Sequence, residues 1–370
     1  MEIKKTQLTI PCYWNKGILN KIIKYSSNAI NDIKVAEIYG CLAKESIGHG
    51  RAANTVPDIN RKYALNFRKY VELLGLRFIY LLNAPLLVKY SIQSKEIRNY
   101  IKWIVEDFKA DALMITSYEL MKLVRKLYPT VLIYISTIAG IKNITQLKRF
   151  LDIKPKRVVV HHDVNRNFND LKKLIKQSAK LNIELELMLT ESCLRRCPNR
   201  DAHYKHLSDG GVDKPFHTIC NARKLMYPIE FLKANFIRPE DLYFYEKMGI
   251  HIFKITGRSK KPNWLPGVVK AYLSRSYNGN LIKLLGIDPS LNAEDWIYIN
   301  NKSLDGFLKS FPLTEKEKDE DIYCNEWISR LYKQKDFLVK DESKYKINSN
   351  GVLYCYSSGE HVSTIFGREK

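Results

Sequence analysis

Three consecutive stretches decide the fold: Arg77-Phe-Ile-Tyr-Leu-Leu82, Ser94–Asp107, and Ala112-Leu-Met-Ile-Thr116. The first and third are short apolar runs, and such runs predict buried strands. In the middle stretch apolar residues recur at helical spacing, at Ile97, Ile101 and Ile104, which predicts an amphipathic helix. A strand, a helix and a second strand in this order predict two parallel strands joined by a crossover helix.

The same alternation extends in both directions along the chain and gives eight strand candidates. They are Leu8–Pro11, Val35–Tyr39, Arg77–Leu82, Ala112–Thr116, Val131–Ser136, Arg157–His161, Ile183–Leu189 and Ile252–Ile255. Eight strand–helix repeats predict an α/β fold, a TIM-like (β/α)8 barrel that is closed or nearly closed. A doubly wound open sheet is the alternative, but no glycine-rich fingerprint follows the first strand.

Two segments interrupt or follow this repeat. Thr190–His251 form a long insertion after the seventh strand, and a C-terminal extension follows Gly279. We therefore expect a barrel domain at 1–278 that carries a cysteine loop at 190–220. The extension at 279–332 is expected to fold back on the barrel, and 333–370 to form a polar tail.

The chain has 61 Lys and Arg against 39 Asp and Glu, a net charge of +22. This charge suits nucleic acid, whose phosphates bind Lys and Arg. However, the lysines are spread over predicted helix faces and form no block of like charge, and Lys, Ile, Asn and Tyr all have AT-rich codons. Genome composition is therefore the favoured explanation of the charge, and RNA binding is the alternative.

The N-terminus, Met-Glu-Ile-Lys-Lys, carries no secretory signal pattern. No stretch approaches the ~20 apolar residues of a membrane span, so we expect a cytoplasmic protein. Seven cysteines in such a protein indicate metal binding or catalysis rather than a disulfide framework. Cys12 and Cys355 are interpreted as buried packing residues.

The informative cysteines surround a polar loop after the seventh strand. Cys193 and Cys197 stand four apart, and Cys220 follows in the insertion. Iron–sulfur ligands are often distant in sequence, although the spacing does not exclude zinc. For a fourth ligand we favour Cys324 in the extension over Cys41 after the second strand, and an exogenous ligand is the third possibility.

Residues at the carboxyl ends of barrel strands converge on the face that carries the chemistry of such enzymes. Arg258, after the eighth strand, is expected to bind a carboxylate or phosphate through a bidentate fork, with a structural salt bridge as the alternative. Lys254 lies on the same strand face and is expected to point inward. Arg51, in the Gly48-His-Gly-Arg51 loop, is a third cationic candidate.

Two further groups of polar residues lie on this face. His161 and Asp163, with His162 between them, follow the sixth strand. A His–Asp pair suits a general base or a proton relay, whereas ordinary loop histidines are the alternative. Flanking the cysteine loop are residues expected to tune a bound metal centre, namely Glu191, Arg200 and His203.

Two of these motifs carry a family resemblance. Glu191-Ser-Cys193-Leu-Arg-Arg-Cys197-Pro and Ile252-Phe-Lys254-Ile-Thr-Gly257-Arg258 resemble motifs of peptidase family U32, the collagenase-like group. The resemblance implies a barrel-like domain with a [4Fe–4S] cluster on four cysteines. It also implies oxygen-independent hydroxylation, an activity of some members. Thr256 stands where the family motif has an acid, and the cysteine spacing differs, so we expect a divergent member.

Three function classes follow. The first is an iron–sulfur enzyme of oxygen-independent hydroxylation or related redox chemistry on a small molecule, a peptide or RNA. An electron-transfer protein or a second U32-type protein is its expected partner. The second is a peptidase-like hydrolase with a structural metal, although no Ser-His-Asp, nucleophile-elbow or zincin motif appears. The third is an RNA-binding or scaffold protein, supported only by charge.

Overall fold

A computed structural model gives the fold. It describes residues 5–29, 32–51, 55–85, 92–208, 210–212, 216, 219–220, 223–224, 227–287, 297–312, 316–339, 345–347 and 353–355. Cys355 lies in the last of these ranges, as part of β12 (Leu353–Cys355).

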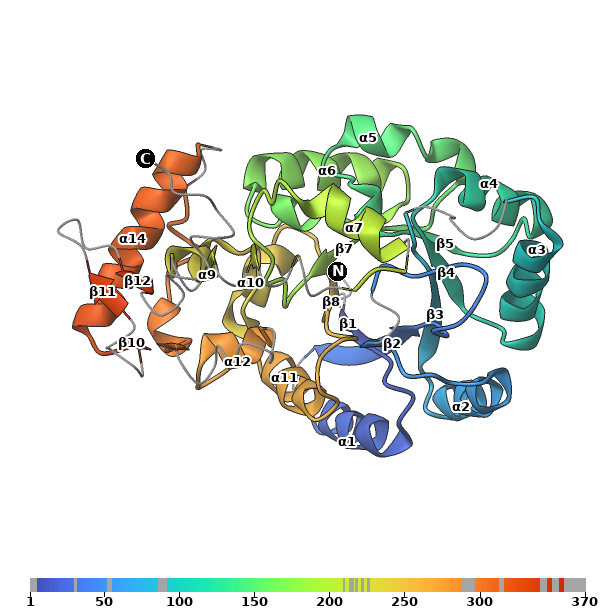
Figure 1. Ribbon diagram of the computed structural model, residues 1–370, viewed down its shortest axis with the longest axis horizontal. Helices are drawn as coiled ribbons and strands as arrows, with labels where there is room; N and C mark the ends of the chain where they lie inside the picture. Colours follow the sequence, from blue (N-terminus) through green and yellow to red (C-terminus); the bar gives the residue numbers. More distant parts are fainter. Residues whose placement is uncertain are drawn as a thin grey trace.

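Eight parallel strands close into a barrel in sequence order (Figure 1). They are β1 (Thr6–Pro11), β2 (Ile33–Gly40), β3 (Arg77–Leu82), β4 (Ala112–Ile115), β5 (Ile133–Ile135), β6 (Arg157–Val159), β7 (Glu184–Met188) and β8 (Ile252–Lys254). The ring closes where Leu8 of β1 pairs with Val35 of β2 on one side and with Phe253 of β8 on the other. The predicted TIM-like barrel is confirmed, and the open sheet is excluded.

Helices between the strands surround the barrel (Figure 1). They are α1 (Lys16–Ser27), α2 (Arg61–Leu73), α3 (Lys95–Lys102), α4 (Tyr118–Leu127), α5 (Ile144–Lys148) and α6 (Phe168–Lys180). Side-chain caps begin them, because Asn15, Asn60, Ser94 and Ser117 each accept a hydrogen bond from the first turn of a helix. Ile97 and Ile101 are buried on α3, as their spacing predicts.

The amino-terminal half of the barrel interior holds a charged network. Arg157 of β6 donates to both oxygens of Glu37 on β2, at 2.6 and 3.1 Å. Its guanidinium also lies 3.6 Å from Glu186 of β7 and stacks over the Tyr134 ring at 4.3 Å. Thr9 donates a further hydrogen bond to Glu37. The core at this level is therefore polar: Glu37 is hydrogen-bonded to Arg157, whereas Glu186 is held by charge alone, since neither of its oxygens has a hydrogen-bond partner among the described residues.

Helix α11 (Trp264–Leu273) follows β8 and packs against α1 in the ring around the barrel. The insertion and the extension add further elements: α7 (Arg200–Ser208), α9 (Ile229–Lys233), α10 (Leu242–Glu246), α12 (Leu281–Leu285), β9 (Ile297–Ile299), α14 (Glu317–Lys333), β10 (Phe337–Val339), β11 (Tyr345–Ile347) and β12. Strand β9 pairs antiparallel with β10, and β11 with β12. Helix α14 packs against α9 at the end of the molecule opposite α3 (Figure 1).

Helix α14 also reaches the cysteine loop. Arg195 and Arg196 of that loop both pair with the buried carboxylate of Glu320 on α14, at 2.9 and 2.8 Å. Separately, every helix in the described part of the chain is too short or too polar to cross a lipid bilayer.

Candidate functional site

A cavity of about 50 Å³ lies inside the barrel at the carboxyl ends of the strands. Because a water molecule needs roughly 10–15 Å³, this cavity has room for a small polar group. Its lining includes three of the residues that the sequence predicted as catalytic, namely Arg51, Lys254 and Arg258. Glu191 is the carboxylate among its lining residues.

Arg258 lies in the turn after β8 and is buried. Its Nη1 donates to the Cys41 sulfur at 3.1 Å, so a thiol is the partner recorded for this guanidinium. The turn depends on Gly257, which has φ of 151°; an added Cβ would lie 2.5 Å from the Trp264 ring. A residue with a side chain is therefore strained at position 257.

Lys254 is the last residue of β8 and is buried within the barrel. Its Nζ lies 3.8 Å from the centroid of the Tyr39 ring and 3.2 Å from the Met114 sulfur. Burial lowers the pKa of Lys254 to about 8, because charge is disfavoured in a low-dielectric interior. Its side chain can therefore exchange between the charged ammonium and the neutral amine near pH 8.

Arg51 reaches the cavity from the loop after β2. The Gly50 N–H donates to Asn83 Oδ1 at 3.2 Å, and an added Cβ at Gly50 would lie 2.3 Å from Ile138. This close approach fixes the loop against the barrel. His49 in the same loop is buried, and burial together with the charges of Arg258 and Arg51 lowers its pKa to about 3.

Glu191 is buried and accepts a hydrogen bond from the Cys193 N–H at 2.8 Å. Burial opposes its ionisation, but His162, Arg200 and this hydrogen bond outweigh burial and lower its pKa to about 2. The Glu191 carboxylate therefore interacts with His162, Arg200 and the Cys193 N–H, which do not line the cavity. The cavity has an excess of cationic side chains, which suits an anionic ligand.

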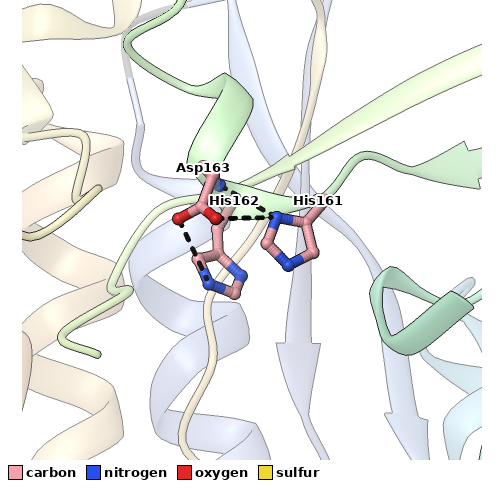
Figure 2. Close-up of side chains that lie close together, drawn as sticks. All are labelled: His161, His162 and Asp163. Atoms are coloured by element: carbon pink, nitrogen blue, oxygen red, sulfur yellow. Dashed lines mark hydrogen bonds and ion pairs between the residues drawn. The ribbon is translucent and has the colours of Figure 1, made fainter. Parts of the chain in front are cut away.

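His161, His162 and Asp163 follow β6 and face one another (Figure 2). Asp163 lies 3.5 Å from His161 Nδ1 and 3.9 Å from His162 Nε2, and His161 Nδ1 accepts the Asp163 N–H at 3.3 Å. Burial first, and the neighbouring ring second, lower the pKa of His161 to about 3. The three residues are not among those that line the described cavity.

Of the predicted cysteine ligands, Cys193 is exposed, yet the groups around its thiol raise the pKa to about 12, first by desolvation and then through Glu191. Arg200 and Lys224 lower that pKa, so both cations lie near the sulfur. Cys197 and Cys220 are half-buried. Lys224, four residues after Cys220, donates to the Ser192 carbonyl, which joins this segment to the cysteine loop.

The two candidates for a fourth ligand lie in other surroundings. Cys324 is buried in α14, and the charged groups that act on its thiol are Arg166, Lys233, Glu320 and Asp321. None of these is among the groups that act on Cys193. Cys41 accepts a hydrogen bond from Arg258. Among the described residues, the groups that act on the Cys193 thiol are Glu191, Arg200 and Lys224, and none of Cys41, Cys324 and Cys197 is one of them.

Sequence reasoning missed several residues of the interior. Tyr204 of α7 lines the cavity, and the charges that act on its hydroxyl include Arg200, Cys193 and Arg51, so it lies between the cysteine loop and the mouth. No sequence pattern marks it. The network of Glu37, Arg157 and Glu186 did leave a signal, since charged residues inside apolar strands are unusual.

Comparisons with known proteins point to one family. The model of peptidase family U32 matches residues 66–193. An uncharacterized protease of Methanocaldococcus jannaschii is 26% identical over 332 residues, which cover 85% of this chain and 96% of the relative. Among solved structures, a U32 peptidase aligns with a TM-score of 0.46 at 11% identity, covering 68% of this chain and 93% of its own. A chitinase of Rhizomucor miehei aligns with a TM-score of 0.38 at 12% identity, covering 73% and 98%.

Proposed function

Because the chain belongs to peptidase family U32, we propose that it is an iron–sulfur enzyme of oxygen-independent hydroxylation or related redox chemistry. Its substrate is a small molecule, a peptide or RNA, and the mouth of its barrel binds a carboxylate of the substrate or of an oxygen donor. The observation that carries the proposal is the cavity lined by Arg51, Lys254 and Arg258, whose carboxylate, Glu191, is directed elsewhere.

The cationic residues of the cavity have distinct tasks in this proposal. Arg258 binds the carboxylate with its planar guanidinium, since Arg and carboxylate groups match in a bidentate fork. Arg51 adds a second positive charge from the loop after β2. Lys254, with its pKa lowered to about 8 by burial, holds a proton at Nζ below that pH and releases it above. Tyr204, from a helix of the insertion, helps to exclude water.

The cysteine loop supports an iron–sulfur cluster on three thiols. Cys193, Cys197 and Cys220 would hold it, because Lys224 joins the Cys220 segment to the loop. The negative charge of such a group suits the nearby cations Arg200 and Lys224. A bound metal deprotonates a coordinating thiol outright, so the raised pKa of Cys193 is no obstacle. The cluster would supply electrons to the reaction.

The fourth corner of that cluster is not assigned to a cysteine in this proposal. Cys324 and Cys41 each have their own partners, Cys324 among the charged groups around α14 and Cys41 at Arg258. An exogenous ligand or the substrate itself is therefore proposed to complete the site. This choice replaces the four-cysteine set that the family resemblance implies.

Anaerobic purification tests the proposal. The wild-type protein should be brown and contain about four iron atoms per chain. Cys193→Ala should lose iron and soluble yield together, because metal binding and folding are coupled. The matched control is Cys12→Ala, which removes a buried thiol at the end of β1 and should keep the iron. Unchanged iron in Cys193→Ala would refute the ligand assignment.

A hydrolase is the second candidate, and the name of the archaeal relative as a protease favours it. Hydrolysis at this site would use one metal ion to polarise a carbonyl and activate water. A colourless protein that carries one zinc per chain and cleaves a peptide would support the hydrolase over the redox enzyme.

A further inference from the structure

We propose that His161, His162 and Asp163 bind one divalent transition-metal ion, and that Glu191 orients His162 from behind. This site does not use the predicted cysteine ligands and does not depend on the proposed function.

The geometry of the three side chains is that of a ligand set. One ligand atom from each lies within 4.8 Å of the others, and Figure 2 shows the two rings facing the carboxylate. His161 Nδ1 and His162 Nε2 lie 3.5 and 3.9 Å from Asp163 oxygens, too far for good hydrogen bonds. His161 Nδ1 accepts the Asp163 N–H at 3.3 Å, a long hydrogen bond that an ion at this nitrogen would replace. An ion bound at about 2.0–2.2 Å from each ligand would draw the group together by a small shift.

His162 gives the independent indication. Its side chain is fully buried, and neither ring nitrogen has a hydrogen-bond partner within the described part of the chain. A buried polar group without a partner costs about 1–3 kcal/mol, so this imidazole needs a ligand. Its Nε2 faces Asp163, and its Nδ1 lies 3.8 Å from Glu191. One nitrogen toward a metal and the other toward a carboxylate is the usual setting of a metal-binding histidine.

Two imidazoles and one carboxylate favour Zn²⁺ or Fe²⁺ over Ca²⁺ or Mg²⁺, which prefer oxygen ligands.

Asp163 is held in place by groups that leave it able to bind an ion. Asn235 donates to its Oδ1 at 3.1 Å, and the Arg196 N–H donates to the same oxygen at 3.3 Å. Lys142 pairs with Oδ2 at 3.2 Å, but its side chain is 46% exposed. The ammonium can therefore move into solvent when a divalent cation takes its place. Through Arg196, the ion would also stabilise the cysteine loop.

Titration with Co²⁺ after removal of metals by a chelator tests the site. Wild-type protein should bind one Co²⁺ with visible d–d bands, and this site should give no near-ultraviolet thiolate charge-transfer band. His162→Gln and Asp163→Asn should weaken binding by at least about 100-fold, since even outer partners of a ligand contribute roughly 10–100-fold. His251→Gln, a histidine that enters β8 at the other end of the barrel, is the matched control and should bind like wild type.

Three results would overturn the proposal: no Co²⁺ bound by wild type, equal binding in His162→Gln, or a sole site whose thiolate band disappears in Cys193→Ser. Thermal melting gives a second readout that needs no folded variant, because a ligand that binds only the native state raises the Tm. A wild-type Tm that does not change in saturating Zn²⁺ would also count against the site. Loss of iron in Cys193→Ala leaves all these outcomes unchanged, so failure of the proposed function is distinguishable.

Discussion

The two ends of the barrel interior both hold buried charged side chains, but the contact partners of these side chains differ. At the amino-terminal end, Arg157 is flanked by Glu37, Glu184 and Glu186 and is 1% exposed. At the carboxyl-terminal end, Lys254 and Arg258 contact a ring, a thioether and a thiol, and the Glu186 carboxylate acts on Lys254 through its charge without a direct ion pair. Among the described residues, carboxylates contact the buried cation directly at the first end and not at the second.

This difference separates a structural network from a binding site. A buried ion pair contributes little net stability, but removal of one partner is costly because a buried charge is left alone. A buried cation that no carboxylate contacts keeps this desolvation penalty in the free protein, and binding of an anionic ligand offsets it. Burial and charge are similar at the two ends, and the difference in partners is the reason for proposing the carboxyl-terminal end as the binding site.

The largest expected effect is at the paired end. Arg157→Met removes the buried cation that Glu37 and Glu186 share and leaves Glu37 with only the partly exposed Arg77. It should lower the free energy of unfolding by about 3–5 kcal/mol. Urea denaturation measures this change. Arg77→Met removes another partner of Glu37, at 2.5 Å, but the Arg77 side chain is 43% exposed and the loss should be smaller. Equal losses would show that the network does not depend on burial.

The second-largest effect is expected at the carboxyl-terminal end, on ligand binding. Arg258→Met should weaken binding of a small dicarboxylate about 10–100-fold, since a hydrogen bond to a charged group contributes about 1.5–3 kcal/mol. Isothermal titration calorimetry measures the affinity. Cys41→Ala removes only the thiol that Arg258 contacts and should retain most of the binding. Weaker loss in Arg258→Met than in Cys41→Ala would contradict the assignment.

The pH dependence sharpens the comparison further. Burial lowers the pKa of Lys254 from 10.5 to about 8, so carboxylate binding should weaken as pH rises through about 8, and Lys254→Met should flatten this part of the profile. Stability should respond in the opposite direction. Between about pH 8 and pH 10.5, Lys254 is protonated in the unfolded chain but neutral in the native protein. In this range Lys254 therefore increases the free energy of unfolding as the pH rises. A wild-type binding profile that is flat through pH 8 would exclude Lys254 from the site.

The smallest effect is expected at the surface. Lys44 and Asp58 are 2.5 Å apart, but their side chains are 76% and 64% exposed. Lys44→Ala should change the free energy of unfolding by less than about 0.5 kcal/mol, because water screens such pairs. The same urea titration checks it, and a loss close to that of Arg157→Met would remove the distinction between the barrel interior and the surface.

Local pattern was sufficient for the fold. Apolar runs such as Phe78–Leu82 and the helical spacing of Ile97 and Ile101 depend on neighbours in the chain, and both elements lie where they were expected. Barrel geometry then predicted which residues share a face. Arg51 is far in sequence from Lys254 and Arg258, yet one cavity contains all three.

The sequence alone could not predict which side chains pair across the barrel. Arg157 and Glu37 are 120 residues apart, and only the closed ring determines that their side chains meet. The surroundings of Cys324 could not be predicted for the same reason. The buried face of α14, which includes Cys324, is determined by the ion pairs of Glu320 with Arg195 and Arg196. His162 is adjacent to two predicted residues, but its importance depends on Glu191 from the next strand end.

The most direct test is a crystal structure of anaerobically purified protein grown with a small carboxylate. The account predicts the carboxylate on Arg258 inside the barrel mouth, with iron bound by Cys193, Cys197 and Cys220 beside it. A carboxylate bound elsewhere on the molecule, or those three thiols separated and without iron, would contradict it.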